Sequence, residues 1–209
     1  MKFPAFLEDA FTTGYTSKDA DGDVFIFELK DLGAIKISDG RLFAFDPLAL
    51  SFEEPFAKQF PKGSFMVQLA VATINGKEKR TGLARVKFSE DAPKKWEMAL
   101  VEGQDPKELD GDDFFGFEVD SGTAAFMDVR AYEEWEDVYS DEQTFNAVNA
   151  ALNKNFVPTC SHLLWEGKKS NGAFFTTGYG DGLFGCYIGY DAKGKVCRLV
   201  CDCGLLGWE

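Results

Sequence analysis

The sequence lacks any hydrophobic run of the ~18–20 residues that are needed to cross a bilayer. Its first residues, MKFPAFLEDAF, also lack the long apolar core and the small-residue cleavage site of a secretory signal peptide. These two absences predict a cytoplasmic protein that has no membrane partner.

Histidine is almost absent, and the cysteines lack the spacing of a metal site. His162 is the only histidine among 209 residues and no Cys-x-x-Cys pair occurs, so we expect no metal site. In a reducing cytoplasm we expect free thiols that pack as small hydrophobic residues: Cys160, Cys186, Cys197, Cys201 and Cys203. The last three share parity on a predicted strand, which places them on one face of it.

An excess of positive charge is also absent. The chain carries 35 Asp and Glu residues against 22 Lys and Arg residues, a net charge of −13. Because nucleic acid is a polyanion, direct binding to it is not expected. The charge is concentrated in residues 90–142, which hold 18 acidic and 4 basic residues, whereas residues 1–89 hold 12 of each.

This acidic segment also contains apolar and aromatic residues, so we interpret it as a folded element with one strongly negative surface and not as a solvated tail. Part of its charge, such as Asp120, is expected to serve turns. The remainder lies in residues 102–113 and 133–142 and supplies the candidates for binding a basic protein partner: Glu102, Asp105, Glu108, Asp110, Asp112, Asp113, Glu133, Glu134, Glu136 and Asp137.

Most of the chain has the pattern of short strands joined by turns. The composition is 45% hydrophobic and no long linker interrupts it, so we expect one globular domain over residues 1–209. The clearest hairpin joins Phe65–Ile74 to Thr81–Phe88 through Asn75-Gly76. In its second strand Leu83, Arg85 and Lys87 alternate with Ala84, Val86 and Phe88, which predicts one solvent face and one buried face. Val24–Leu29 and Ala34–Ile37 are two further apolar runs.

A helical pattern begins near Arg130. Tyr132, Trp135 and Val138 recur at helical spacing, Ser140-Asp141 is a plausible cap for a second helix, and the chain then returns to strands. The predicted fold class is therefore α+β and β-rich, a mostly antiparallel, sandwich-like sheet system with a helical segment near residues 130–152.

Two loops resemble functional motifs. Asp120-Ser121-Gly122-Thr123 resembles the catalytic tetrapeptide of aspartic proteases, but only seven residues follow the candidate partner Asp202, so a strand-end turn is the better interpretation. The glycine-rich loop Gly178–Gly182 lacks the Lys-Ser/Thr of a phosphate loop and precedes a strand, which favours a compact turn and leaves a small-ligand loop open. His162 follows Ser161 directly, and since adjacent strand residues face opposite sides, a structural histidine is favoured.

A series of short motifs resembles a known family. In order along the chain they are Asp46-Pro47, Phe60–Phe65 (FPKGSF), Trp96–Leu100 (WEMAL), Gly116–Thr123 (GFEVDSGT), Gly180-Asp181-Gly182, Gly189-Tyr190-Asp191 and Gly194. Together they resemble domain of unknown function 4241, over roughly Arg41 to Leu205. The resemblance implies a bacterial, soluble, single-domain protein without an established reaction, and it marks Asp120, Asp181 and Asp191 as motif residues.

Two function classes follow from these observations. The first is a non-catalytic acidic interaction protein, such as an immunity protein that neutralises a basic toxin. The second is an enzyme or a small-ligand or metal binder that uses aspartates at strand-end turns: Asp120, Asp181, Asp191 and Asp202. We favour the first class, assign no catalytic residue and no cofactor, and leave the oligomeric state open.

Overall fold

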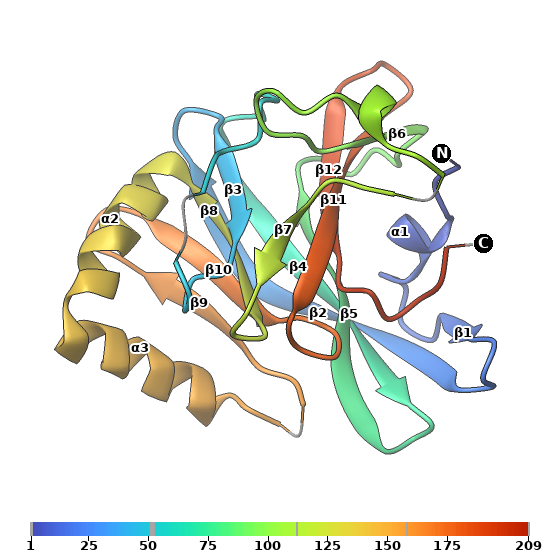
Figure 1. The fold of residues 1–209 in the computed structure, drawn as a ribbon, viewed down its shortest axis with the longest axis horizontal. Coiled ribbons are helices and arrows are strands. Elements are labelled where there is room, and N and C mark those ends of the chain that lie inside the picture. The colour runs from blue at the N-terminus through green and yellow to red at the C-terminus, as the bar shows by residue number, and fades with distance from the viewer. Residues whose placement is uncertain (1, 51–52, 112, 158, 209) are drawn as a thin grey trace.

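Two antiparallel β-sheets lie face to face in a computed structural model that describes residues 2–50, 53–111, 113–157 and 159–208 (Figure 1). The partner-binding candidate Asp112 lies outside the described residues. The sheets are held together by a shared apolar core, and each also has a covered outer face.

The last described strand in the sequence lies near the middle of the larger sheet. Its strands run in the order β1 (Thr16–Lys18), β2 (Val24–Ile37), β4 (Gly63–Ile74), β5 (Glu78–Lys87), β12 (Val196–Asp202), β11 (Gly182–Tyr190) and β6 (Lys95–Met98), and β7 (Gly116–Val119) pairs with the first half of β11. The smaller sheet has the order β3 (Leu42–Phe45), β8 (Thr123–Asp128), β10 (Asn171–Thr176) and β9 (His162–Glu166).

Helices cover the outer faces of both sheets. The short helix α1 (Phe6–Asp9) packs on the larger sheet, whereas α2 (Val129–Ser140) and α3 (Glu142–Lys154) lie over the smaller one (Figure 1). A single 3₁₀ turn, η1 (Pro106–Glu108), lies in the connection from β6 to β7. The described chain therefore has four layers, which run from α1 through the two sheets to α2 and α3.

The innermost core lies between the two sheets. Val67 and Val86 of the larger sheet and Phe126 and Phe175 of the smaller sheet are fully buried in it. Burying each such side chain stabilises the fold by roughly 1.5–3 kcal/mol. Trp135 of α2 fills the outer layer of the smaller sheet, where its indole N–H donates to the carbonyl of Pro47 at 3.0 Å.

The predicted fold class, a β-rich α+β protein with mainly antiparallel sheets, is confirmed. The hairpin between β4 and β5 is also confirmed, with Asn75 at φ 50° and Gly76 at φ 68° in the left-handed region that this turn requires. The predicted helical segment corresponds to α2 and α3. Asp141 separates them and caps α3, because its carboxylate accepts the backbone N–H of Thr144 at 2.8 Å.

The apolar runs Val24–Leu29 and Ala34–Ile37 form one strand and not two. β2 continues through both, and its register shifts between Asp31 and Gly33. Gly33 has a φ of 142°, and the side chain of Leu164 lies 2.7 Å from the position that a Cβ would occupy there. Only glycine fits this bulge, which bends β2 against the smaller sheet.

The expectation that the Arg85 side of β5 faces solvent is wrong. Leu83 is 1% exposed and Arg85 is 6% exposed. The N-terminal segment covers this side, and the guanidinium of Arg85 lies 4.1 Å from the ring centroid of Phe11. The alternation in β5 could not reveal this, because α1 has only four residues and shows no helical period.

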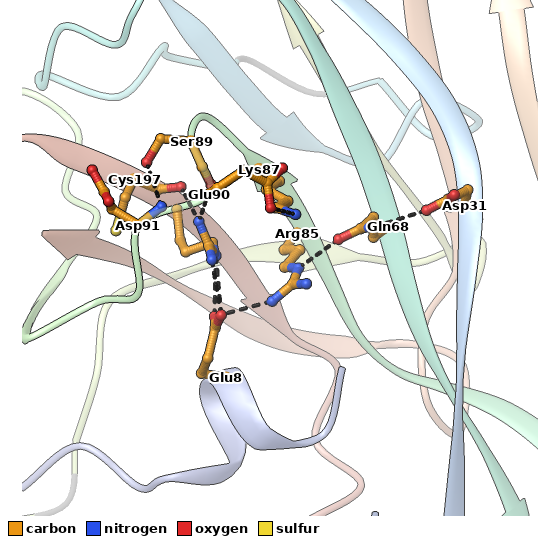
Figure 2. A network of polar contacts seen from close by, with 10 residues as sticks. Glu8, Asp31, Gln68, Arg85, Lys87, Ser89, Glu90, Asp91 and Cys197 are labelled. Atoms are coloured by element: carbon orange, nitrogen blue, oxygen red, sulfur yellow. Dashed lines mark hydrogen bonds and ion pairs between the residues drawn. The ribbon is translucent and has the colours of Figure 1, made fainter. Parts of the chain in front are cut away.

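Glu8 of α1 joins two buried arginines from adjacent strands (Figure 2). Its carboxylate lies 3.0 Å from Nη1 of Arg85 and 2.9 Å from Nη2 of Arg198. Arg85 also donates through Nε to Gln68 at 2.9 Å, and Gln68 donates to Asp31 at 2.8 Å. Burial lowers the pKa of the Arg85 guanidinium, an effect that Glu8 opposes and Arg198 reinforces. The shared carboxylate is thus what holds two like charges on one sheet face.

We expect Glu8→Gln to lower the free energy of unfolding by about 3 kcal/mol, because it leaves buried arginine charge without its carboxylate. Chemical denaturation at neutral pH measures this loss. Glu90→Gln is the matched control, since Glu90 pairs with Lys87, which lies on the same strand as Arg85, but the Glu90 side chain is 89% exposed. The control should unfold as the wild type does. Equal losses in the two variants would show that Glu8 does not anchor α1.

Candidate functional site

The acidic candidates from the sequence lie in two separate places. The described members of the first group are exposed around η1: Glu102, Asp105, Glu108, Asp110 and Asp113. The second group lies on α2 and consists of Glu133, Glu134, Glu136 and Asp137. Glu134 is half-buried, and the other three are exposed. In Figure 1, η1 lies beside the larger sheet at the upper right and α2 lies at the left edge. The acidic segment therefore does not form the one continuous surface that the sequence suggested.

The second group borders a groove between α2, α3 and the turn from β9 to β10. The groove has a volume of about 470 Å³. Its carboxylates come from Glu134, Asp137, Asp141 and Glu166, which together define the acidic groove. Val138 and Trp165 supply apolar surface, and Lys168 supplies the one basic side chain of the lining. Glu166 was missed from the sequence, because an isolated acid on a short strand gives no signal there.

Glu134 ties the groove to the turn that follows β9. Its carboxylate accepts the backbone N–H groups of Lys168 and Lys169 and the hydroxyl of Ser170, the last at 2.6 Å. Burial raises the pKa of Glu134, but the hydrogen bonds from Ser170 and the two amides outweigh it and hold the pKa below its ordinary value. This carboxylate is therefore ionised at neutral pH and fixed in position.

The acids of both groups form no ion pairs within the described chain. Seven ion pairs occur among the described residues, and none involves an acid between 102 and 142. The acids of those pairs are Glu8, Glu28, Asp39, Glu78, Glu90 and Glu97. The negative charge of the acidic groove is thus not neutralised by ion pairs of the described residues.

The aspartates of the alternative site do not meet. Asp181 and Asp191 flank opposite ends of β11, which separates them by about 30 Å at the rise of an extended strand. Asp191 caps the turn from β11 to β12 by accepting the N–H groups of Lys193 at 2.7 Å and Lys195 at 2.9 Å. Asp120 and Asp181 are exposed. A cleft that contains all four carboxylates is therefore absent from this fold.

Asp46, which the sequence offered only as part of a motif, organises the turn at Asp120. Its buried carboxylate accepts the N–H of Asp120 at 2.9 Å, the N–H of Ser121 at 2.7 Å and the hydroxyl of Ser121 at 2.6 Å. The same carboxylate accepts the N–H of Leu48 at 2.8 Å. The motif that resembles a protease tetrapeptide is therefore a turn held by a neighbouring loop.

The glycine-rich loop meets this turn above a polar hollow of about 300 Å³. A Cβ built on Gly122 would lie 3.3 Å from the Cα of Gly180, so the two backbones are in contact. Arg80 enters the hollow and donates to the carbonyl of Gly178 at 3.0 Å, while Nε pairs with Glu78 at 3.0 Å. Hydroxyl and amide side chains line much of the rest: Ser121, Thr123, Asn149, Asn153, Thr159, Ser161, Thr176 and Thr177.

Ser161 and His162 do not form a catalytic pair. The Ser161 hydroxyl donates to the carbonyl of Leu152 at 2.6 Å. Burial, followed by the charge of Lys30, lowers the pKa of His162. Within the described residues, no three or more His, Cys, Asp or Glu side chains are placed to hold a metal ion. None of the described helices is long and apolar enough to span a membrane.

All five cysteines are free and buried. Cys201 and Cys203 belong to the core between the sheets, but Cys197 does not share their face as the sequence suggested. The register passes from the pair Gly189–Arg198 to the pair Tyr190–Val196, so Cys197 is the extra residue of a bulge. Burial raises the pKa of its thiol to about 11.

Asp202, like Asp191, is buried, whereas Asp120 and Asp181 are exposed. Its carboxylate accepts the N–H of Gly204 at 2.9 Å and the indole N–H of Trp208 at 2.8 Å. Burial raises the pKa of Asp202. In contrast, the hydrogen bond from the backbone N–H of Lys195 is the main cause that lowers the pKa of Asp191. The two aspartates therefore respond to pH in opposite directions.

Comparison with known proteins identifies a family. The model of a family described as "Protein of unknown function (DUF4241)" matches residues 35–201, which agrees with the motifs that the sequence displays between residues 41 and 205. No curated protein and no solved structure matches the chain.

We expect the two aspartates to give opposite pH dependences of stability. Asp202 has a folded-state pKa above the ordinary 3.8, so its ionisation costs stability as pH rises above that value. Asp202→Asn should remove this loss. Asp191 has a folded-state pKa below 3.8, so its contribution is present above that value and is lost as pH falls below it. Urea denaturation of both Asn variants and the wild type across pH 3–7 measures the difference in the free energy of unfolding between each variant and the wild type. If this difference changed with pH in the same direction for both variants, the opposite roles of the two aspartates would be contradicted.

Proposed function

We propose that this chain, which belongs to the DUF4241 family, is a non-catalytic binding protein that takes up a basic protein partner in its acidic groove. A toxin that it neutralises as an immunity protein is a partner of this kind, and a bacterial cytoplasm is the compartment in which we place the function. The single observation that carries the proposal is a concave set of carboxylates without ion-pair partners in the described chain.

The electrostatics of the groove favour a cationic ligand. Unpaired carboxylates within a concave surface concentrate negative potential, which attracts basic side chains and increases the rate of encounter. Glu134 is already fixed by the turn after β9, and Asp141 is fixed as the cap of α3. A partner would therefore meet an arrangement that loses little side-chain freedom on binding.

The apolar surface of the groove suits the stems of long basic side chains. Trp165 contributes only a narrow strip of apolar surface, because it is 5% exposed and packs in an aromatic cluster with Trp135, whose ring centroid lies 5.3 Å away. Val138 is half-buried beside it. Lysine and arginine bury their methylene stems on such surface while their charged groups contact carboxylates. The lining thus combines the two contacts that a basic polypeptide needs.

Reversing charge in the groove should weaken partner capture. We expect a basic protein to co-purify with the tagged chain from its own cells, and Asp137→Lys with Glu166→Lys to weaken this binding by at least ~10-fold. Both residues are exposed, so the folded state should survive. The complex should dissociate as salt rises from about 0.05 M to about 0.5 M, because screening shortens the range of the attraction.

The matched control reverses the same amount of charge around η1, with Glu102→Lys and Asp110→Lys, both at exposed positions. This variant should keep the partner. Equal loss in the groove and control variants would show that net charge alone drives the binding. Failure to recover any basic protein at low salt would refute the proposed function.

A further inference from the structure

A third cavity lies on the outer face of the larger sheet, the face that does not contact the smaller sheet. It opens where two neighbouring strands separate. The ladder between β11 and β12 includes the pair Cys186–Cys201. Beyond that pair the two strands have different partners. Gly182–Gly185 of β11 pairs with β7, whereas Asp202 of β12 pairs with Leu83 of β5. Residues that follow β12 lie across the opening between the two strands. A cavity of about 440 Å³ remains between these segments, a volume in the range of small-molecule sites.

The walls of the cavity are mainly aromatic and aliphatic. They are formed by Phe114, Leu183, Phe184, Tyr187, Leu206 and Trp208. The rings of Tyr187 and Trp208 lie 4.8 Å apart between centroids and belong to the apolar cluster on the outer face of the larger sheet. Leu183 is 48% exposed, which leaves apolar surface accessible at this site. The walls therefore favour a ligand with a hydrophobic body.

The carboxylate of Asp202 is the anionic group of the lining, and it lacks a counter-ion. Its two oxygens accept one hydrogen bond each, from Gly204 and from Trp208, and no ion pair of the described residues includes it. Each oxygen retains a lone pair. Burying a carboxylate without a cation is costly, so an incoming ammonium group would compensate what the fold leaves unpaired.

We propose that this cavity binds a small organic ammonium ion that carries an aromatic or aliphatic body. The ammonium group donates to Asp202, and the aromatic faces of Tyr187 and Trp208 add cation–π attraction. Besides Asp202, the ionisable side chains that line the cavity are those of Tyr187 and Lys2. Lys2 is exposed and makes no ion pair with Asp202. This site differs from the acidic groove in its residues and in its ligand, and it does not depend on the proposed function.

The test compares phenethylamine with phenethyl alcohol, which has nearly the same shape but no charge. The readout is the indole N–H resonance of Trp208 at neutral pH, assigned by its loss in Trp208→Phe. We expect the amine to give a saturable shift at about millimolar concentration, and the alcohol to bind at least ~10-fold more weakly. Equal affinities, or no saturable shift with the amine, would overturn the proposal.

Two variants separate the charge from the walls. Asp202→Asn should weaken the amine by about 10-fold and leave the alcohol unchanged, while the control Asp191→Asn should bind both as the wild type does. Phe114→Ala, at a half-exposed position, should weaken both compounds because it removes a wall. Unchanged amine binding in Asp202→Asn would refute the role of the carboxylate. Should that variant fail to fold, the comparison of the two compounds on the wild type decides alone.

Discussion

The covering of the larger sheet depends on one carboxylate between two buried arginines. Arg85 and Arg198 come from neighbouring strands, and each would oppose the burial of the other if Glu8 did not contact both. A four-residue helix has little stability of its own, so α1 depends on the contacts of Glu8 with the two arginines to stay in place. The aromatic residues around α1 can then pack on the sheet, and the wall that carries Tyr187 and Trp208 is a part of this layer.

Local chemistry made much of this fold predictable. Asn75-Gly76 specified its turn because few other dipeptides adopt positive φ twice, and Asp141 marked a helix start because its carboxylate caps the first turn. The position of β12 between β5 and β11 was not predictable, since strand partners are chosen by contacts far apart in sequence. The burial of Arg85 was missed for the same reason, because its cover lies 77 positions earlier at Glu8.

The candidate sites show the same division. Composition identified the acidic segment, but its separation into two surfaces follows from how β7 and β8 carry the chain from one sheet to the other before α2 begins. Asp120 looked chemical in sequence and proves to belong to a turn that Asp46 holds. Asp202 looked like another turn residue, and its turn contact to Gly204 is real. Its environment became visible only when Trp208 and the diverging strands were placed around it.

The order of strands in the larger sheet also bears on how the protein is made. β5 can pair with β4 as soon as their hairpin leaves the ribosome, but its other edge must wait for β12, more than a hundred residues later. During that interval the nascent chain presents an unpaired strand edge, which is a surface that promotes association with other chains. Synthesis of Val196–Asp202 closes this edge and at the same time delivers Arg198 to Glu8. Completion of the sheet is therefore a late event, and interruption of translation before this strand would release a fragment prone to aggregation.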